Sequence, residues 1–298
     1  MADTKKIFLV TGGNSGIGFE CCRALAKLPG SHVILAGRSH ARVSEAVAKV
    51  KAAAAPTSVV EAGLVDLGSL ASVRDFADKL RARDLRFSTL VCNAGVQVAR
   101  KELTIDGFES TFGINHLGHF LLVELLRDCT QRILVVSSGT HDPAERTGMP
   151  EPNVSDLDQL ARGMDKFNNM EAYTTSKLLN LLFTKEFVRR YPNGPKILAY
   201  TPGYTPDSGL SRNHNKAFLF FAQPVFLLIS WWVGSPITTS EYTGGYMAKI
   251  AGQDPSIPAY ANGDYIRVDE AWQPSSLAMD PVLSKELWDK SVRWAGLQ

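Results

Sequence analysis

The chain lacks the features that mark several specialised classes of protein. Its 298 residues carry a formal net charge of only +2 and the basic residues are scattered, so nothing indicates a surface for the phosphate backbone of nucleic acids. The cysteines show no CxxC or Cys/His spacing, and His116 and His119 show no metal-ligand pattern, so we expect neither a disulfide scaffold nor a metal site. Small buried core positions are expected for Cys21, Cys22, Cys92 and Cys129.

A hydrophobic fraction of 45% and a charged fraction of 21% are those of an ordinary globular protein. An apolar run begins within ten residues of Met1, so we expect no targeting peptide and a reduced, cytoplasmic protein. Short apolar runs alternate with segments of helical spacing, which is typical of a parallel sheet covered on both faces. Strands are expected at 7–10, 32–36, 59–64, 89–93, 132–137 and 196–200. Helices are expected at 19–28, 41–54, 70–81, 108–126 and 171–190.

This alternation predicts an α/β fold class. We expect a single doubly wound Rossmann-type domain over residues 1–298, with a mostly parallel sheet of six to seven strands and a C-terminal lid segment. Residues 141–170 are polar and rich in Pro, Asn, Asp and Gly, which indicates an irregular insertion beside a strand end.

The expected lid covers residues 207–240 and contains an apolar stretch at 217–234. This stretch approaches the length of a transmembrane helix, but Pro224 lies near its middle. We expect it to cover a substrate or to contact a membrane surface peripherally. A subunit contact in a homo-oligomer and a true membrane span are the alternatives.

A glycine-rich loop lies between the first expected strand and the first expected helix. Glycines there let the backbone approach a pyrophosphate closely, and the helix N-terminus offers N–H groups and a partial positive charge. A plain tight turn is the alternative. We expect this loop to bind cofactor phosphates through Gly12, Asn14, Ser15, Gly16, Ile17 and Gly18.

The spacing G-x-x-x-G-x-G of this loop resembles that of the short-chain dehydrogenase/reductase family. Further landmarks of the family follow in order between about residues 7 and 210. They are Asp66-Leu67, Asn93-Ala94-Gly95, Asn115, Ser138, Tyr173-x-x-x-Lys177 and Pro202-Gly203. The resemblance implies a nicotinamide cofactor with further contacts at Asp66, Leu67, Asn93, Ala94, Gly95, Tyr173, Lys177, Pro202, Gly203, Thr205 and Ser208.

The end of the second expected strand indicates which cofactor binds. A site for NAD places Asp or Glu there to bind the ribose 2′-hydroxyl, but this chain has Ala-Gly-Arg-Ser at 36–39. Arg38 can make charge-assisted hydrogen bonds to a 2′-phosphate, and Arg42 lies one turn further on. NADP(H) is therefore the expected cofactor. The alternative is that Arg38 is a solvated surface charge.

Hydride transfer between nicotinamide and a carbonyl carbon needs a proton donor at the oxygen. Tyr173 and Lys177 share one face of an expected helix, and a nearby ammonium favours the ionised form of a tyrosine, whose pKa is ordinarily about 10. The resemblance implies that Lys177 also binds the nicotinamide ribose, that Ser138 polarises the substrate oxygen, and that Asn115 positions a water linked to the lysine. Each residue alone has an ordinary structural alternative, but together and in this order they indicate a catalytic set.

The wide spacing between Ser138 and Tyr173 resembles that of retinol-dehydrogenase-like and protochlorophyllide-reductase-like members. The segments 202–214 and 287–297 resemble the second group. Two positions depart from it. Tyr204 stands where those reductases usually carry Cys, and their Asn-Ala-Ala-Val reads Asn-Ala-Gly-Val here.

We predict an NADP(H)-dependent oxidoreductase that transfers hydride to or from a carbonyl, an alcohol or a conjugated double bond of a bulky hydrophobic substrate. A tetrapyrrole double-bond reductase resembling protochlorophyllide reductase is the first alternative. The second is an NADP(H)-binding regulatory or membrane-docking protein with little turnover, and the intact set of catalytic candidates argues against it.

Overall fold

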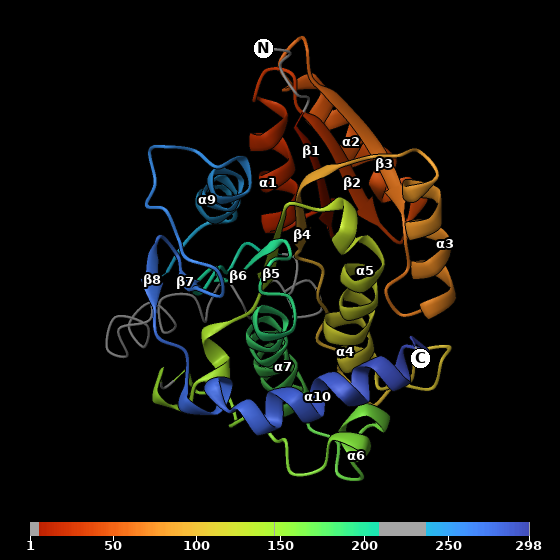
Figure 1. Cartoon of the computed structure of the whole chain (residues 1–298), viewed down its shortest axis with the longest axis vertical. Helices are drawn as coiled ribbons and strands as arrows, with labels where there is room; N and C mark the ends of the chain where they lie inside the picture. Colours follow the sequence, from red (N-terminus) through yellow and green to blue (C-terminus); the bar gives the residue numbers. More distant parts are fainter. Residues whose placement is uncertain (1–5, 146, 209–236, 298) are drawn as a thin grey trace, which may run out of the picture.

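The computed structural model describes residues 6–145, 147–208 and 237–297. These residues form an eight-stranded sheet of order β3-β2-β1-β4-β5-β6-β7-β8, in which every pairing except the last is parallel (Figure 1). The strands are β1 (Ile7–Thr11), β2 (His32–Gly37), β3 (Val59–Leu64), β4 (Phe87–Cys92), β5 (Arg132–Val136), β6 (Lys196–Thr201), β7 (Tyr265–Arg267) and β8 (Glu270–Trp272). The strand order reverses between β1 and β4, which confirms the doubly wound fold. The sheet exceeds the expected six to seven strands because β7 and β8, three residues each, are too short to form apolar runs.

A layer of helices covers each face of the sheet, because successive side chains of a strand point to opposite sides and both sets must be buried. Ile7 and Leu9 of β1 belong to one core, and Phe8 and Val10 belong to the other. The first core packs beneath α3 (Leu70–Arg81), α5 (Gly118–Leu126) and α7 (Asn169–Arg190). The second packs beneath α1 (Gly16–Ala26), α2 (His40–Ala52) and α9 (Ser240–Gly252).

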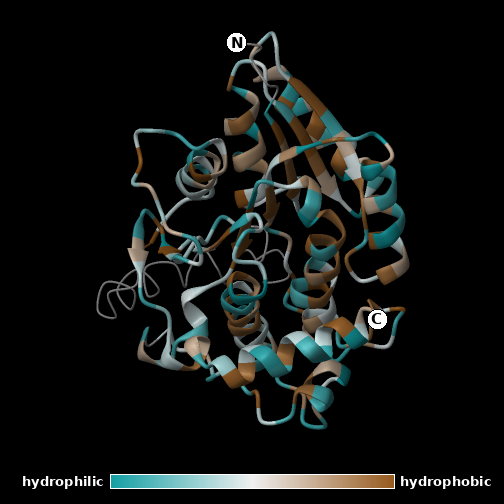
Figure 2. Ribbon diagram, in the orientation of Figure 1, coloured by the Kyte–Doolittle hydropathy of each residue, from teal (hydrophilic) through white to brown (hydrophobic). Residues whose placement is uncertain are grey.

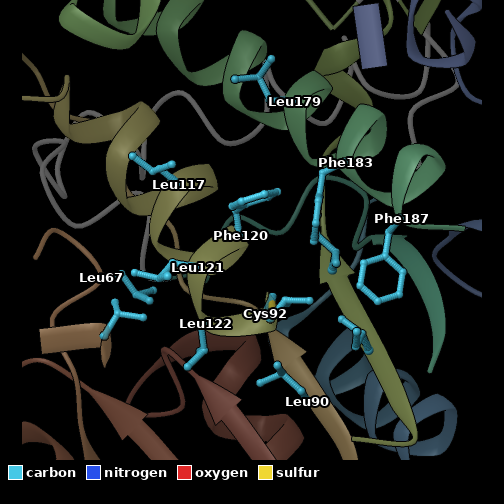
Figure 3. Close-up of a cluster of buried hydrophobic side chains, with 14 of the residues drawn as sticks. Leu67, Leu90, Cys92, Leu117, Phe120, Leu121, Leu122, Leu179, Phe183 and Phe187 are labelled. Atoms are coloured by element: carbon cyan, nitrogen blue, oxygen red, sulfur yellow. The ribbon is translucent and has the colours of Figure 1, made fainter. Parts of the chain in front are cut away.

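Aromatic and leucine side chains of α5 and α7 fill the first core. Figure 3 shows Phe120 and Phe183 side by side above Cys92 of β4. In the described part of the chain all four cysteines are free thiols. The expected burial is confirmed for three of them, and Cys129 is half-buried.

Helix α10 (Pro281–Trp294) packs against α7 on the outside of the molecule (Figure 1). Its hydrophilic and hydrophobic residues alternate along the ribbon in Figure 2, and Leu287 and Trp288 are buried. The Trp288 ring stacks on Phe183 at 5.7 Å and meets Phe120 edge-on at 5.0 Å. Ser291 Oγ lies 3.0 Å from the buried His116 Nε2. The helix therefore completes the first core from the outside.

The helix expected at 108–126 is divided into three parts. α4 (Ser110–Phe112) leads into a π-helical turn (Gly113–Leu117), from which α5 continues. The insertion 141–170, expected to be irregular, contains the short helix α6 (Leu157–Arg162), which the Asp156 side chain caps. Six residues are too few to show helical periodicity in the sequence.

The apolar stretch 217–234, expected as a lid, lies within residues 209–236, outside the described residues. Among the helices that the structure does describe, none has both the length and the hydropathy needed to cross a membrane.

Candidate active site

The candidate cofactor loop and the candidate catalytic side chains meet at one edge of the sheet. The glycine-rich loop follows β1, Asn93 follows β4, Ser138 follows β5 and Pro202 follows β6. Because β1, β4, β5 and β6 are neighbours and run parallel, their carboxyl ends lie side by side. Helix α7 brings Tyr173 and Lys177 to the same edge, where Lys177 Nζ donates a hydrogen bond of 3.3 Å to the last carbonyl of β5.

The glycine-rich loop has a conformation that depends on its glycines. Gly12 and Gly16 have φ values of +65° and +54°, a region that favours glycine. A side chain at Gly18 would lie 2.3 Å from Asn93 Nδ2 and 2.5 Å from Gly12 O, so glycine is required where α1 begins. Ser15 caps α1 without a side-chain hydrogen bond within the described residues, which leaves N–H groups at the helix start for an anion.

Thr11 and His119 hold the glycine-rich loop against the Asn93 loop, although the sequence marks neither as part of the site. Thr11 Oγ1 accepts hydrogen bonds from the N–H groups of Asn93 (3.0 Å) and Ala94 (3.1 Å). His119 Nε2 lies 2.9 Å from Thr11 Oγ1, and its Nδ1 lies 3.1 Å from Asn115 O. Asn93, expected to contact cofactor, donates from Nδ2 to Thr11 O at 2.8 Å, so this amide group shapes the loop.

Arg38 comes directly after β2 and is exposed, with Nη1 4.0 Å from Asp66 Oδ2 after β3. Asp66 Oδ1 accepts a hydrogen bond of 2.9 Å from the Gly68 N–H, which fixes the carboxylate at the strand end. Asn14 lies nearby, since a side chain at Gly37 would come within 2.8 Å of Asn14 Oδ1. This corner of the sheet edge therefore presents one exposed guanidinium and one carboxylate held by a backbone hydrogen bond.

Asn115 is fully buried in the π-helical turn and joins the Asn93 loop to α7. Its Oδ1 accepts a hydrogen bond from Val96 N (2.8 Å), and its Nδ2 donates to Val96 O (2.9 Å) and to Ser176 Oγ (3.0 Å). A side chain at Gly95 would lie 3.5 Å from both Asn115 Oδ1 and Lys177 Nζ. Asn115 and Lys177 thus flank the same short piece of backbone.

Ser138 and Tyr173 face each other at the end of β5. A hydrogen bond joins their side chains, and Ser138 Oγ also accepts a bond of 3.3 Å from the Thr140 N–H. Lys177 Nζ lies 5.5 Å from the centre of the Tyr173 ring. The three predicted side chains are therefore gathered in one place.

Burial governs the charges of this group. It raises the pKa of Tyr173 to about 12, and the hydrogen bond with Ser138 opposes this rise only in part. Burial also lowers the pKa of Lys177 to about 8. Burial is thus the largest influence on the pKa of both groups, and the effect of the lysine charge on the tyrosine stays a prediction. A neutral phenol beside a buried lysine can donate a proton to a substrate oxygen.

The loop after β6 is tied to the start of α9. Thr238 Oγ1 donates a hydrogen bond of 2.7 Å to Pro202 O and lies 2.9 Å from Thr205 Oγ1. The Asp207 carboxylate accepts hydrogen bonds from Ser240 N (3.0 Å) and Ser240 Oγ (3.1 Å). Residues 202–208 and 237–240 therefore lie together at this edge of the sheet.

The remaining predicted contacts lie around these loops. Gly203 has a φ of +72°, and Ser208 N donates to Thr205 O at 3.1 Å. Ile17 packs against the second core. The Leu67 side chain is buried in the first core, so its backbone is the part that faces the site.

Known proteins resemble the chain over most of its length. A family model described as short chain dehydrogenase matches residues 6–143. A WW domain-containing oxidoreductase of Danio rerio is 37% identical over 97% of this chain and 68% of that protein. The chain belongs to the short-chain dehydrogenase/reductase family. A protochlorophyllide reductase of Avena sativa is 31% identical over 98% of this chain and 100% of that protein.

Solved structures place this short-chain dehydrogenase/reductase among similar folds. A crystal structure of an uncharacterised protein from Mycobacterium paratuberculosis has a TM-score of 0.73 and 27% identity, and covers 98% of this chain and 94% of that one. A complex of Pseudomonas aeruginosa RhlG with NADP has a TM-score of 0.62, covering 89% of this chain and 94% of that one. At 21% identity it shows the fold alone.

Proposed function

We propose that the protein is an NADP(H)-dependent oxidoreductase that transfers hydride to or from a carbonyl or alcohol group of a bulky hydrophobic substrate. The observation that carries the proposal is the meeting of Ser138, Tyr173 and Lys177 at the edge onto which the glycine-rich loop opens. Reduction of a carbonyl needs a group that polarises the oxygen and a proton donor for it. This set supplies both.

The residues present fit a dinucleotide that carries a 2′-phosphate. Gly12 and Gly18 let the glycine-rich loop pack closely against the Asn93 loop, and the start of α1 offers N–H groups to a pyrophosphate. Arg38 is exposed and has no closer ion-pair partner in the described residues than Asp66 at 4.0 Å, so its guanidinium can bind the 2′-phosphate. When bound, NADPH supplies the hydride.

The side chains divide the remaining work. Tyr173 is protonated at neutral pH, as burial raises its pKa still further above its ordinary value of 10, so it can donate the proton to the substrate oxygen. Ser138 hydrogen-bonds the same oxygen and polarises the carbonyl. The Lys177 ammonium binds the nicotinamide ribose and stabilises the negative charge that develops on Tyr173. In the reverse direction the ionised form of Tyr173 accepts the proton from an alcohol, while Ser138 hydrogen-bonds the alcohol oxygen.

We assign the hydrophobic substrate on the basis of the segment 207–240. The described residues on either side of the apolar stretch lie beside Pro202, where Thr238 bonds the Pro202 carbonyl and Asp207 bonds Ser240. We propose that this stretch covers the substrate. Attachment of a cytoplasmic protein to a membrane surface, or contact with a second copy of the chain, are the alternative uses of it.

A tetrapyrrole double-bond reductase is the second candidate. The similarity to protochlorophyllide reductases over nearly the whole chain favours it. Tyr204, however, is exposed where those reductases usually carry Cys, so a thiol is missing from the loop beside Pro202. A third candidate is a regulatory or membrane-docking protein that keeps this fold and binds NADP(H) but has little turnover.

The test is NADPH oxidation by the full chain against a panel of retinoid, steroid, fatty and aromatic carbonyls, with protochlorophyllide in the light as a further arm. Tyr173→Phe removes the proton but keeps the ring, so turnover should fall by about 100-fold or more while NADPH still binds. Tyr191→Phe is the matched control, because Tyr191 ends α7 and bonds Glu124 away from the site. Turnover that survives in the Tyr173→Phe variant would refute the assignment.

A further inference from the structure

A buried histidine three residues after Ser138 has two hydrogen bonds that the proposed chemistry does not explain. His141 ends the 3-10 turn Gly139–His141 and is 1% exposed. Its Nδ1 lies 2.7 Å from the carbonyl oxygen of Ser138, and its Nε2 lies 3.2 Å from the backbone nitrogen of Ser275. The ring also meets Tyr265 of β7 edge-on at 5.4 Å. His141 therefore joins the backbone of Ser138 to two elements from the C-terminal part of the chain.

The two partners fix the tautomer of the His141 ring. A carbonyl oxygen accepts and a backbone N–H donates, so Nδ1 carries the proton and Nε2 accepts. Burial lowers the pKa of His141, and the opposing effects of the Ser138 carbonyl and of Asp142 are smaller. The ring is therefore neutral near neutral pH. A second proton on Nε2 would face the Ser275 N–H and break that contact.

The loop that follows Ser138 is attached to β7 at a second point. Glu145 Oε1 lies 3.6 Å from Arg267 Nη1, and both side chains are largely buried. A side chain at Gly139 would lie 2.7 Å from Glu145 Oε2, so the carboxylate lies directly against the turn. The backbone on the far side of Ser138 is thus held at His141 and again at Glu145.

We propose that His141 is a positioning residue, whose Nδ1–H holds the Ser138 carbonyl so that the Ser138 hydroxyl is aimed at the Tyr173 phenol. The inference rests on the proposed function, in which Ser138 polarises the substrate oxygen. The Ser138 backbone sets the place of its Cβ, and the Oγ has a weak bond of 3.3 Å from Thr140 N–H to orient it. Because a displacement of about 1 Å in a catalytic group can cost roughly 100-fold in rate, loss of the His141 bond should lower kcat by about 10- to 100-fold.

A double-mutant cycle tests whether His141 acts through Ser138. His141→Phe should lower kcat by about 10- to 100-fold in the wild-type background. In a Ser138→Ala background the same substitution should change kcat by less than about twofold, because the hydroxyl that it misplaces is gone. KM for NADPH should stay unchanged throughout. A purely structural role of His141 would lower kcat equally in both backgrounds.

Two conservative variants locate the bond that matters. The amide nitrogen of His141→Asn can take the place of Nδ1, so kcat should return to within about threefold of wild type. His141→Gln can reach only the Ser275 side, so it should behave like His141→Phe. His32→Asn is the matched control, since His32 is a buried histidine at the opposite end of the sheet, where β2 begins. It should leave kcat unchanged even if it lowers the melting temperature.

Three results would overturn the inference: an unchanged kcat in His141→Phe, equal losses in both backgrounds, or rescue by Gln instead of Asn. Imidazole nitrogen NMR gives a readout independent of turnover, and a proton found on Nε2 of His141 would also refute it. Failure of the proposed function is distinct, because the unaltered enzyme would then lack NADPH oxidation that depends on Tyr173. That outcome would overturn both.

Discussion

Replacing Lys177 by methionine is expected to make the protein more stable and less active at the same time. The ammonium is buried at the end of β5, and burial lowers its pKa from the ordinary 10.5 to about 8. A shift of that size corresponds to about 3 kcal/mol of free energy that the folded state loses by holding the charge at pH 7. Methionine fills similar space without charge, so Lys177→Met should gain up to about 3 kcal/mol at pH 7.

Removal of the lysine leaves no orphaned acceptor at the strand end. The Val136 carbonyl that receives Lys177 Nζ at 3.3 Å also receives Asn180 Nδ2 at 3.1 Å. The gain should therefore not be offset by an unsatisfied buried oxygen. Turnover should nonetheless fall by about 100-fold, since the cation that acts on Tyr173 is lost.

The stability gained by Lys177→Met should decrease as the pH rises. The folded pKa of Lys177 lies below the unfolded value, so between about pH 8 and 10.5 the unfolded chain binds more protons and wild-type stability from this group rises with pH. The advantage of Lys177→Met should accordingly shrink towards zero across that window. Taking the difference in stability between Lys177→Met and the wild type cancels the contribution of other groups that titrate between these pH values.

Urea unfolding followed by tryptophan fluorescence at pH 7, 8, 9 and 10 measures this difference. Lys79→Met is the control, because Lys79 is exposed and pairs with Asp75 on the surface at 2.6 Å. Its effect should stay within about 0.5 kcal/mol at every pH. A Lys177→Met variant that is less stable than wild type at pH 7, or whose gain does not change with pH, would refute the reasoning.

Three further predictions concern the cofactor and the substrate. Arg38→Ala should weaken NADPH binding by about 10- to 100-fold with little effect on NADH, because a charge-assisted hydrogen bond contributes about 1.5–3 kcal/mol; equal losses in a fluorescence titration would contradict this. Gly18→Ala should abolish binding of both cofactors in the same titration, since its methyl group would lie 2.3 Å from a side-chain nitrogen, and unchanged affinity would be the contrary result. Replacing Phe220, Phe221 and Trp231 together by Ser should raise KM for a large apolar substrate and leave NADPH affinity unchanged. Wild-type kinetics with a dissociated oligomer would instead make this segment a subunit contact.

Patterns within short stretches of sequence predict the strands β1 to β6 and the placement of the catalytic candidates on α7. The apolar runs mark β1 to β6 because each of these strands has five or six mainly apolar residues, and the spacing of four residues places Tyr173 and Lys177 on one face of α7. β7 and β8 were not predicted because three residues are too few to form an apolar run. α6 was not predicted because six residues are too few to show helical periodicity. Their formation depends on the rest of the sheet being present.

The contacts that support the site could not be predicted from the sequence for a different reason. Thr11 meets His119 across 108 positions of sequence, and His141 meets Ser275 across 134. No spacing rule connects such pairs, because folding alone brings them together. The directions of the pKa shifts of Tyr173 and Lys177 could not be predicted either, because they follow from the degree of burial, which sequence does not report.

Helix α10 follows every strand in the chain, yet it supplies the rings that close the first core. At a synthesis rate of about 5–20 residues per second, Phe183 of α7 precedes Trp288 by about 5–20 s, and Phe120 of α5 precedes it by about 8–34 s. During that interval Phe120 and Phe183 lack their cover, although the strands beneath them have already been made. A nascent chain at that stage presents an apolar surface to chaperones and proteases. Synthesis of α10 therefore covers the last part of this apolar surface.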